Sequence, residues 1–417
     1  MISVSKKVPP KKLLDFEKIR SDFPILDQQI YGRPLVYLDN AATTHKPQAV
    51  LDRIVSLYTR ENSNIHRGVH YLSEASSEAY ENARHAVQHF IHAASADEII
   101  FTSGTTGAIN LLADSFAHAF IKPGDEIIIT EMEHHSNLVP WQVVCLRQGA
   151  RLKVLPMGPD GGLLIDRLPD LITERTRLIA CAHVSNALGI LNPVREIVET
   201  AHQADIPVLV DAAQSAAHLP IDVQALECDF LVFSGHKMYA ETGIGVLYGR
   251  EKYLDAMPPY QTGGGMIDRV RLDETTFADL PLKFEAGTPN IAGAVSLAAA
   301  IEYIQGIGFD AITDYEHNLL DDALRQLNQV DGLCIYGNLL PRCGVVSFNI
   351  EGAHHYDVGV LLDKLGVAIR TGMHCAEPVM QHFGVTGTIR ASVALYNTPE
   401  DIDTLVNGID RAKTMLL

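Results

Sequence analysis

Two side chains able to hold a cofactor between them each follow a short apolar stretch of the chain. Asp211 ends the run PVLV at 207–210, and Lys237 comes soon after the run FLVF at 230–233. Short apolar runs between helical patterns predict buried strands of a parallel sheet, and ligands bind at the carboxyl edge of such sheets. Separately, the Asp would be a turn cap and the Lys a solvated surface residue. Together they suit pyridoxal phosphate, whose aldehyde takes an amine and whose ring nitrogen takes a carboxylate.

Groups that could bind the phosphate of this cofactor come from two further segments. The turn SGTTG at 103–107 lies between a predicted strand and a predicted helix. A glycine-rich turn that opens a helix offers free backbone N–H groups and the positive end of the helix dipole to an anion. The alternative is a plain N-cap made by Ser103 or Thr105. Ser234 and His236, next to the lysine, would supply the second wall of a phosphate site.

Three more polar side chains follow predicted strands and so reach the same edge of the sheet. His134, after the strand at 126–130, could stack on a pyridine ring, although an ordinary loop histidine would look the same. Asn186 follows the strand at 178–182 and could donate to a ring oxygen. Gln214 could do the same from the segment after Asp211.

A second group of reactive residues lies near the end of the chain. Cys375, in the loop RTGMHCA, has Gly372 and His374 beside it, and a thiol there can be exposed and partly ionised, as a nucleophile requires. Arg390 presents a fork that matches a carboxylate with two hydrogen bonds. The alternative for a lone loop cysteine is a structural role, and the other five cysteines mostly lie in or beside apolar runs, as core fillers do.

Composition limits the partners and the location of the protein. The chain has 417 residues and a formal net charge of −18, which argues against nucleic acid or an anionic membrane as a main partner. No stretch approaches the ~18 apolar residues of a membrane helix, and the basic start lacks the apolar region of a signal peptide. Six scattered cysteines without a CxxC pair suit reduced thiols in the cytoplasm, and we expect no metal site.

Strand and helix patterns alternate through the first two thirds of the chain, which predicts an α/β fold with a mainly parallel sheet and helices on both faces. We expect a large domain at 24–290 and a smaller α+β domain at 291–417, with the segment 1–23 packed against the smaller domain. The expected strands are 35–38, 99–102, 126–130, 152–155, 178–182, 208–211, 230–233, 333–336, 344–350, 367–370 and 389–392. The expected helices are 13–21, 47–60, 73–92, 105–118, 137–149, 194–204, one after Pro289 and one from 399.

Several motifs of the chain occur together in one known family. They are LDNAATTHKP, HRGVH, SGTTGAIN, EMEHHSN, HVSNALG, VDAAQ, FSGHK, FEAGTPN, RTGMHCA and RAS, and they run from about Phe23 to the last helix. The chain resembles the group II (SufS/CsdA-type) cysteine desulfurases, which are class V aminotransferase-like enzymes of pyridoxal phosphate fold type I. The resemblance implies a large domain with a seven-stranded sheet, and a homodimer.

The resemblance also implies a role for each site residue. Lys237 would form the Schiff base, Asp211 would pair with the ring nitrogen, and His134 would stack on the ring. The ring oxygen would contact Gln214 and Asn186. The phosphate would be held by Thr105, Thr106, Ser234 and His236, and by Thr288 of the other subunit. The substrate carboxylate would bind Arg390, in a pocket lined by Arg370, His66, Arg67 and Asn40.

By the same resemblance, L-cysteine would be converted to L-alanine while its sulfur stays on Cys375 as a persulfide. A SufE-like or SufU-like acceptor protein would then carry the sulfur to iron–sulfur cluster assembly. Departures from the family pattern are Ala240-Glu241, Gly107 and Met373. The alternatives are a selenocysteine lyase, another class V aminotransferase, or a catalytically silent scaffold that docks sulfur-transfer partners.

Overall fold

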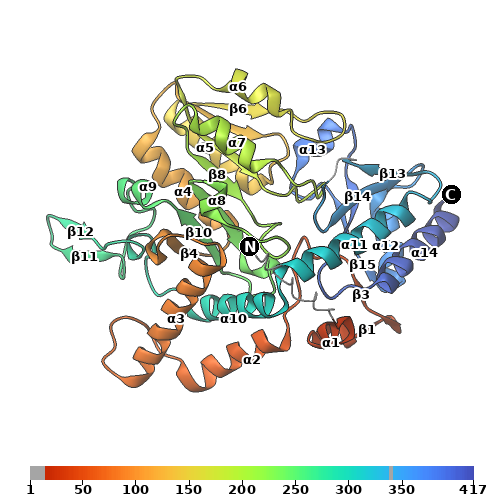
Figure 1. Ribbon diagram of the computed structural model, residues 1–417, viewed down its shortest axis with the longest axis horizontal. Helices are drawn as coiled ribbons and strands as arrows, with labels where there is room; N and C mark the ends of the chain where they lie inside the picture. Colours follow the sequence, from red (N-terminus) through yellow and green to blue (C-terminus); the bar gives the residue numbers. More distant parts are fainter. Residues whose placement is uncertain (1–14, 338–340) are drawn as a thin grey trace, which may run out of the picture.

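A seven-stranded mixed sheet forms the centre of the computed structural model, which describes residues 15–337 and 341–417 (Figure 1). Its strand order is β4–β10–β9–β8–β7–β5–β6, in which β6, β5, β7, β8 and β9 run parallel and β10 runs antiparallel to both β9 and β4. The strands are β4 Ile99–Thr102, β5 Glu126–Thr130, β6 Arg151–Leu155, β7 Thr176–Ala182, β8 Val208–Asp211, β9 Phe230–Ser234 and β10 Gly245–Gly249.

Both faces of this sheet are buried under helices, which explains why its strands are continuous apolar runs. In β9, Leu231 and Phe233 pack into one core cluster while Phe230 and Val232 pack into the other. The first cluster includes residues of α3 (Tyr71–Phe90), α7 (Val194–His202) and α10 (Ile291–Ile307). The second includes residues of α4 (Thr105–Phe120) and α5 (Val139–Gln148). The predicted α/β fold is confirmed.

The C-terminal part of the chain builds a second, four-stranded antiparallel sheet beside the first (Figure 1, right). Its order is β13–β14–β17–β16, with strands β13 Leu333–Tyr336, β14 Val345–Ile350, β16 Arg370–Gly372 and β17 Thr388–Ser392. Its core cluster includes residues of the helices α11 Phe309–Leu327, α12 His355–Lys364 and α14 Pro399–Leu416. This sheet supplies the second wall of the cavity described below.

Contacts that cross the predicted domain boundary come from both ends of the chain. β3 (Val36–Tyr37) pairs with β15 (Val367–Ala368), whereas α10 packs on α3 and on α2 (Gln48–Ser56). The division into 24–290 and 291–417 stays a prediction. Of the segment before residue 24, the structure describes residues 15–23. Within it, Phe23 is fully buried against the rings of Tyr239, Tyr303 and Tyr396. The first part of the helix predicted at 13–21 lies outside the described residues, which include α1 (Phe16–Ser21).

The structure adds elements that the sequence patterns did not indicate. β10 is a short run between glycines, and the loosely patterned stretch 258–290 contains a hairpin of β11 (Ile267–Val270) and β12 (Thr275–Phe277), which projects at the left of Figure 1. The strand predicted at 367–370 is split between β15 and β16. The remaining short elements are β1 Gln29–Ile30, β2 Arg33–Pro34, α6 Leu168–Leu171, α8 Val223–Leu226, α9 Glu251–Ala256 and α13 Glu377–His382.

Over the described residues, none of the helices is by itself both long and apolar enough to cross a membrane. The helices α10 and α11 meet these criteria only as a pair, bent by 80°.

Candidate active site

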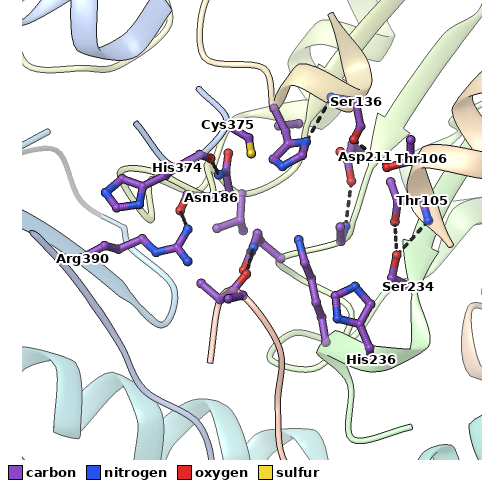
Figure 2. A pocket seen from close by; sticks show the side chains of 18 of the residues that line it. Thr105, Thr106, Ser136, Asn186, Asp211, Ser234, His236, His374, Cys375 and Arg390 are labelled. Atoms are coloured by element: carbon purple, nitrogen blue, oxygen red, sulfur yellow. Dashed lines mark hydrogen bonds between the residues drawn. The ribbon is translucent and has the colours of Figure 1, made fainter. Parts of the chain in front are cut away.

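A cavity of about 310 Å³ opens where the carboxyl edge of the central sheet meets the C-terminal sheet. Figure 2 shows polar side chains converging on it, with Asp211 and Ser234 at the ends of β8 and β9 and Arg390 on β17. The predicted site residues that line the cavity are Thr105, Thr106, His134, Asn186, Asp211, Gln214, Ser234, His236, Lys237, Arg370, Cys375 and Arg390. One cavity therefore gathers twelve of the sixteen predicted residues, including some from each of the sets predicted for the cofactor, the substrate and the sulfur.

Lys237 and Asp211 reach this cavity from neighbouring strands. Lys237 ends a short 3₁₀ turn directly after β9, and Asp211 is the last residue of β8. Burial raises the pKa of the Asp211 carboxyl, opposed by a 2.9 Å hydrogen bond from the Ala213 N–H and by the charge of Lys237. Burial lowers the pKa of the Lys237 amine to about 8, although Asp211 opposes this shift. The amine is therefore much closer to its neutral, nucleophilic form than an exposed lysine is.

His134 is held as a neutral ring in the wall of the cavity. Its Nδ1 accepts a hydrogen bond of 3.0 Å from the Ser136 N–H, which leaves the ring proton on Nε2. Burial lowers the pKa of His134 to about 3, with the charge of Lys237 acting in the same direction. A neutral aromatic ring in this position has a flat apolar face that can stack on another ring.

The loop that carries His134 is fixed from behind by the buried side chain of Glu133. Glu133 Oε1 accepts from the Ala182 N–H at 2.8 Å and contacts the Thr130 hydroxyl, while Oε2 accepts from Asn137 Nδ2 at 2.6 Å. Burial raises the pKa of Glu133 to about 8. One carboxyl thus joins the ends of β5 and β7 to the turn that follows His134.

Hydroxyl and backbone N–H groups cluster at the first turn of α4. The Thr105 N–H donates to Ser234 Oγ at 2.8 Å, Thr105 Oγ1 lies 2.8 Å from the same oxygen, and Thr106 Oγ1 lies 2.7 Å from Ser136 Oγ. The helix begins after Gly104, whose φ of 134° favours glycine and which provides no side-chain cap. The first N–H groups of a sixteen-residue helix are thus combined with hydroxyls, a donor set suited to a phosphate.

The two arginines at the other end of the cavity have different partners. Arg370 binds the Asp39 carboxylate through three contacts of 2.9 to 3.2 Å. Arg390 is 2% exposed, donates from Nη1 to the Asn186 carbonyl at 2.9 Å, and reaches Asp39 only at 3.4 Å. Within the described residues its Nε has no hydrogen-bond partner. Because a buried N–H without an acceptor is costly, Arg390 is the arginine equipped to bind a carboxylate that enters the cavity.

Cys375 occupies a backbone turn that few residues other than glycine adopt. His374 and Cys375 both have φ of 54°, in the left-handed region. Cys375 is exposed, as is Cys334, while Cys145, Cys181, Cys228 and Cys343 are buried. The expectation of core cysteines therefore holds for four of the other five, and Cys334 is the exception.

The two amides predicted to contact the cofactor each have a protein partner as well. Asn186 Nδ2 donates to the His374 carbonyl at 2.6 Å, and Gln214 Nε2 donates to the Ala41 carbonyl at 2.8 Å. Each NH₂ group has two hydrogens, so each retains one donor for a ligand.

Four predicted residues do not line the cavity of the single chain. Asn40 is 2% exposed and faces the interior, where its Nδ2 donates to the Ser392 carbonyl at 2.6 Å and to Asn397 at 3.0 Å. Asn40 is therefore not in the lining of the cavity of the single chain, and its contact with the substrate stays a prediction. His66 and Arg67 lie in an exposed loop, where His66 Nε2 contacts Glu81 at 2.9 Å. Thr288 is exposed in the segment that precedes α10.

Asp39 and Ser136 are site residues that the sequence reasoning missed. Asp39 pairs with both arginines of the cavity, and Ser136 bonds to both His134 and Thr106. Asp39 lies in the motif LDNAATTHKP beside the predicted residue Asn40, and Ser136 lies in EMEHHSN two positions after the predicted residue His134. This closeness in sequence to predicted site residues is the signal that could have identified them.

The fold and this cavity define a class of protein. The chain belongs to the aminotransferase class-V family, which it matches over residues 36–405.

Among the described residues, no group of three or more His, Cys, Asp or Glu side chains is arranged to hold a metal ion.

Within that class, the chain is similar to proteins named cysteine desulfurases. A probable cysteine desulfurase of Halalkalibacterium halodurans is 51% identical over 400 residues, or 96% of this chain and 98% of that protein. The S-sulfonic acid form of the cysteine desulfurase CsdA from Escherichia coli has a TM-score of 0.89 at 39% identity, covering 97% of this chain and 100% of that one. The apo cysteine desulfurase of Thermococcus onnurineus NA1 has a TM-score of 0.91 at 39% identity, covering 99% and 100%. These similarities confirm the predicted family.

Proposed function

We propose that this protein is a pyridoxal phosphate-dependent cysteine desulfurase, which converts L-cysteine to L-alanine and keeps the sulfur on Cys375 as a persulfide. The observation that carries the proposal is an exposed thiol, Cys375, lining the same cavity as the Lys237 amine, the Asp211 carboxyl and the Arg390 guanidinium. A transaminase needs no thiol in that position. Relatives about half identical over nearly the whole chain support the same activity.

The donor set of the cavity fits pyridoxal phosphate. Lys237 would bind its aldehyde, Asp211 its ring nitrogen and His134 its ring face. The ring oxygen would take the free donors of Asn186 and Gln214, and the phosphate would bind Thr105, Thr106, Ser234 and His236. His236 would bind as a neutral ring, because burial lowers its pKa to about 4. When bound, the cofactor supplies an electron sink that weakens the bond between Cβ and sulfur.

The residues of the chain perform the remaining steps. Arg390 binds the substrate carboxylate and so orients the amino acid. Lys237, with its pKa lowered to about 8, takes the proton from Cα as a base and later returns a proton to carbon. The Cys375 thiolate attacks the substrate sulfur, so that a sulfur–sulfur bond forms as the carbon–sulfur bond breaks. The electron pair of the broken bond stays on carbon and is protonated, and no outside oxidant is needed.

The partners of the reaction are part of the proposal. An exposed persulfide on Cys375 would be handed to an acceptor protein of the SufE or SufU kind, in the reducing cytoplasm. A homodimer would bring Thr288, His66 and Arg67, which are exposed on the single chain, to the cavity of the partner subunit. Sedimentation and acceptor-stimulated turnover test these two points separately from the chemistry.

Mass spectrometry after exposure to L-cysteine tests the activity. We expect one added sulfur on the peptide that carries Cys375 and an equal amount of L-alanine in solution. Cys375→Ala should abolish both products, whereas Cys334→Ala, at the other exposed cysteine, should leave them unchanged. Alanine release from L-cysteine by Cys375→Ala would overturn the proposal. If that variant releases alanine from L-selenocysteine only, a selenocysteine lyase activity exists beside the one proposed.

A further inference from the structure

The turn that carries the sulfur acceptor has a backbone that must be held in place from outside. His374 and Cys375 follow one another with φ of 54°, and neither is a glycine. Left-handed backbone at such residues persists only where the surrounding structure over-determines it, and such positions cluster at functional sites. The contacts that hold this turn therefore decide where the thiol is.

Two of these contacts bind the carbonyl groups of the turn. The His374 carbonyl accepts from Asn186 Nδ2 at 2.6 Å, and the Cys375 carbonyl accepts from the His135 N–H at 2.7 Å. Directly after the turn, the Glu377 N–H donates to His135 Nε2 at 3.1 Å. The central sheet thus holds the backbone of the turn from one side.

The third contact comes from the opposite side, through the ring of His374. His374 is 7% exposed as a residue, and its Nε2 lies 2.9 Å from Oγ1 of Thr388, which is 1% exposed. Figure 2 shows the His374 ring and the Cys375 sulfur pointing in opposite directions from the turn. Burial lowers the pKa of His374 to about 3, so the ring is neutral and cannot serve as an acid near neutral pH. Its contacts fit an anchor and do not fit a proton donor.

Thr388 belongs to the strand that also carries the carboxylate-binding arginine. Both Thr388 and Arg390 lie on β17, and their side chains point to the same face because they are two residues apart. The strand β17 therefore carries the guanidinium that binds the carboxylate and, through Thr388 and His374, also holds the turn that carries the thiol.

We propose that His374 is a positioning residue that, through its hydrogen bond to Thr388, locks the left-handed turn and aims the Cys375 thiol into the cavity at a set distance from Arg390. This inference rests on the proposed function for its substrate, but the geometry concerns the chain itself. A misplacement of about 1 Å between reacting groups costs roughly 100-fold in rate. The rate of sulfur transfer is the quantity that the anchor controls.

The test removes the anchor from each end without touching Cys375. Thr388→Val deletes the hydroxyl and keeps the shape of the side chain, whereas His374→Asn removes the ring but tolerates left-handed backbone. Thr388→Ser keeps the hydroxyl and is the conservative control. Thr386→Val makes the same change at an exposed threonine two residues earlier and controls for the loss of a threonine hydroxyl.

Two measurements on the cofactor-loaded protein give the result. In a single turnover with L-cysteine, we expect persulfide formation to slow about 100-fold in Thr388→Val and in His374→Asn, with the cofactor absorbance and the KM for L-cysteine unchanged. Thr388→Ser and Thr386→Val should match the parent. Without substrate, the alkylation rate of Cys375 by iodoacetamide, divided by that of the exposed Cys334 in the same sample, should change severalfold in the two anchor variants only.

Persulfide formation and an alkylation ratio that both match the parent in Thr388→Val and His374→Asn would overturn the inference. Equal loss of cofactor binding and sulfur transfer would also overturn it, because that pattern indicates general damage to the fold. If the parent forms no persulfide, the proposed function fails, and the alkylation ratio still decides whether His374 places the thiol.

Discussion

The side-chain amide of Asn186 donates to the backbone carbonyl of His374 at 2.6 Å. The backbone carbonyl of the same asparagine accepts from Arg390 Nη1 at 2.9 Å. Asn186 follows β7 of the central sheet, whereas the other two residues belong to the C-terminal sheet and its loop. One residue therefore couples the position of the carboxylate-binding guanidinium to the position of the turn that carries Cys375.

Asn186→Ala should separate these two couplings, because it removes the amide and keeps the backbone carbonyl. We expect kcat for alanine release from L-cysteine to fall about 10- to 100-fold, while KM changes little because Arg390 keeps its partner. Steady-state kinetics at saturating cofactor check this prediction. A rise in KM with kcat unchanged would show that Asn186 acts on substrate binding and leaves the cysteine turn in place.

Lys237→Met should stabilise the protein when no cofactor is bound, by an amount that depends on pH. The pKa of Lys237 is lowered from 10.5 to about 8 in the folded protein, so the unfolded chain binds more protons between these two values. The parent therefore gains stability as the pH rises from about 8 to about 10.5, and the methionine variant lacks this gain. We expect the stability advantage of the variant, measured by urea unfolding, to be largest at pH 7 and to shrink across that range. An advantage independent of pH would contradict the lowered pKa.

Arg390→Lys should weaken substrate binding more than Arg370→Lys does. Arg370 is committed to Asp39 by three contacts, whereas Arg390 has a buried Nε without a partner among the described residues. A lysine cannot form the two parallel hydrogen bonds that an arginine makes to a carboxylate. Each hydrogen bond to a charged group contributes about 1.5 to 3 kcal/mol to binding. We expect KM for L-cysteine to rise about 10- to 100-fold in Arg390→Lys and by less in Arg370→Lys. The reverse order would assign the substrate carboxylate to Arg370.

Most of the central sheet could be predicted because its strands are buried on both faces and so appear as unbroken apolar runs. The strand ends at Asp211 and Ser234 followed from these runs, and with them the residues of the cofactor site. β10 was missed because its few residues lie between glycines and carry no alternation of their own. The hairpin β11–β12 was missed because its residues are mostly exposed and so lack an apolar pattern.

Within the site, the sequence indicated which residue types were present but not which of them were already paired. Asn40 was selected from a motif that reaches the cavity, yet its side chain turns inward to Ser392 and Asn397. Its neighbour Asp39 was overlooked although it holds both arginines. Pairings between residues more than 300 positions apart depend on how the two sheets meet, which local patterns do not encode.

The hydrogen bonds around Glu133 have a direction that the sequence also could not reveal. Trp141 Nε1 can only donate, and it donates to Asn137 Oδ1 at 3.0 Å, which fixes Asn137 Nδ2 toward Glu133. The Ala182 N–H donates to the other carboxyl oxygen. Each oxygen of Glu133 therefore faces a group that can only donate: the Ala182 N–H on one side and Asn137 Nδ2 on the other. A glutamine in place of Glu133 would point its NH₂ group at one of these two donors, whichever way its amide is turned.

Glu133→Gln should consequently destabilise the protein by about 1 to 3 kcal/mol, the cost of a buried donor without an acceptor. The penalty should shrink in a Trp141→Phe background, because Asn137, released from its donor, can turn its oxygen toward the introduced amide. A double-mutant cycle by urea unfolding measures this coupling, which we expect to favour the double variant by roughly 1 kcal/mol. Additive effects of the two substitutions would show that Trp141 does not set the orientation of Asn137.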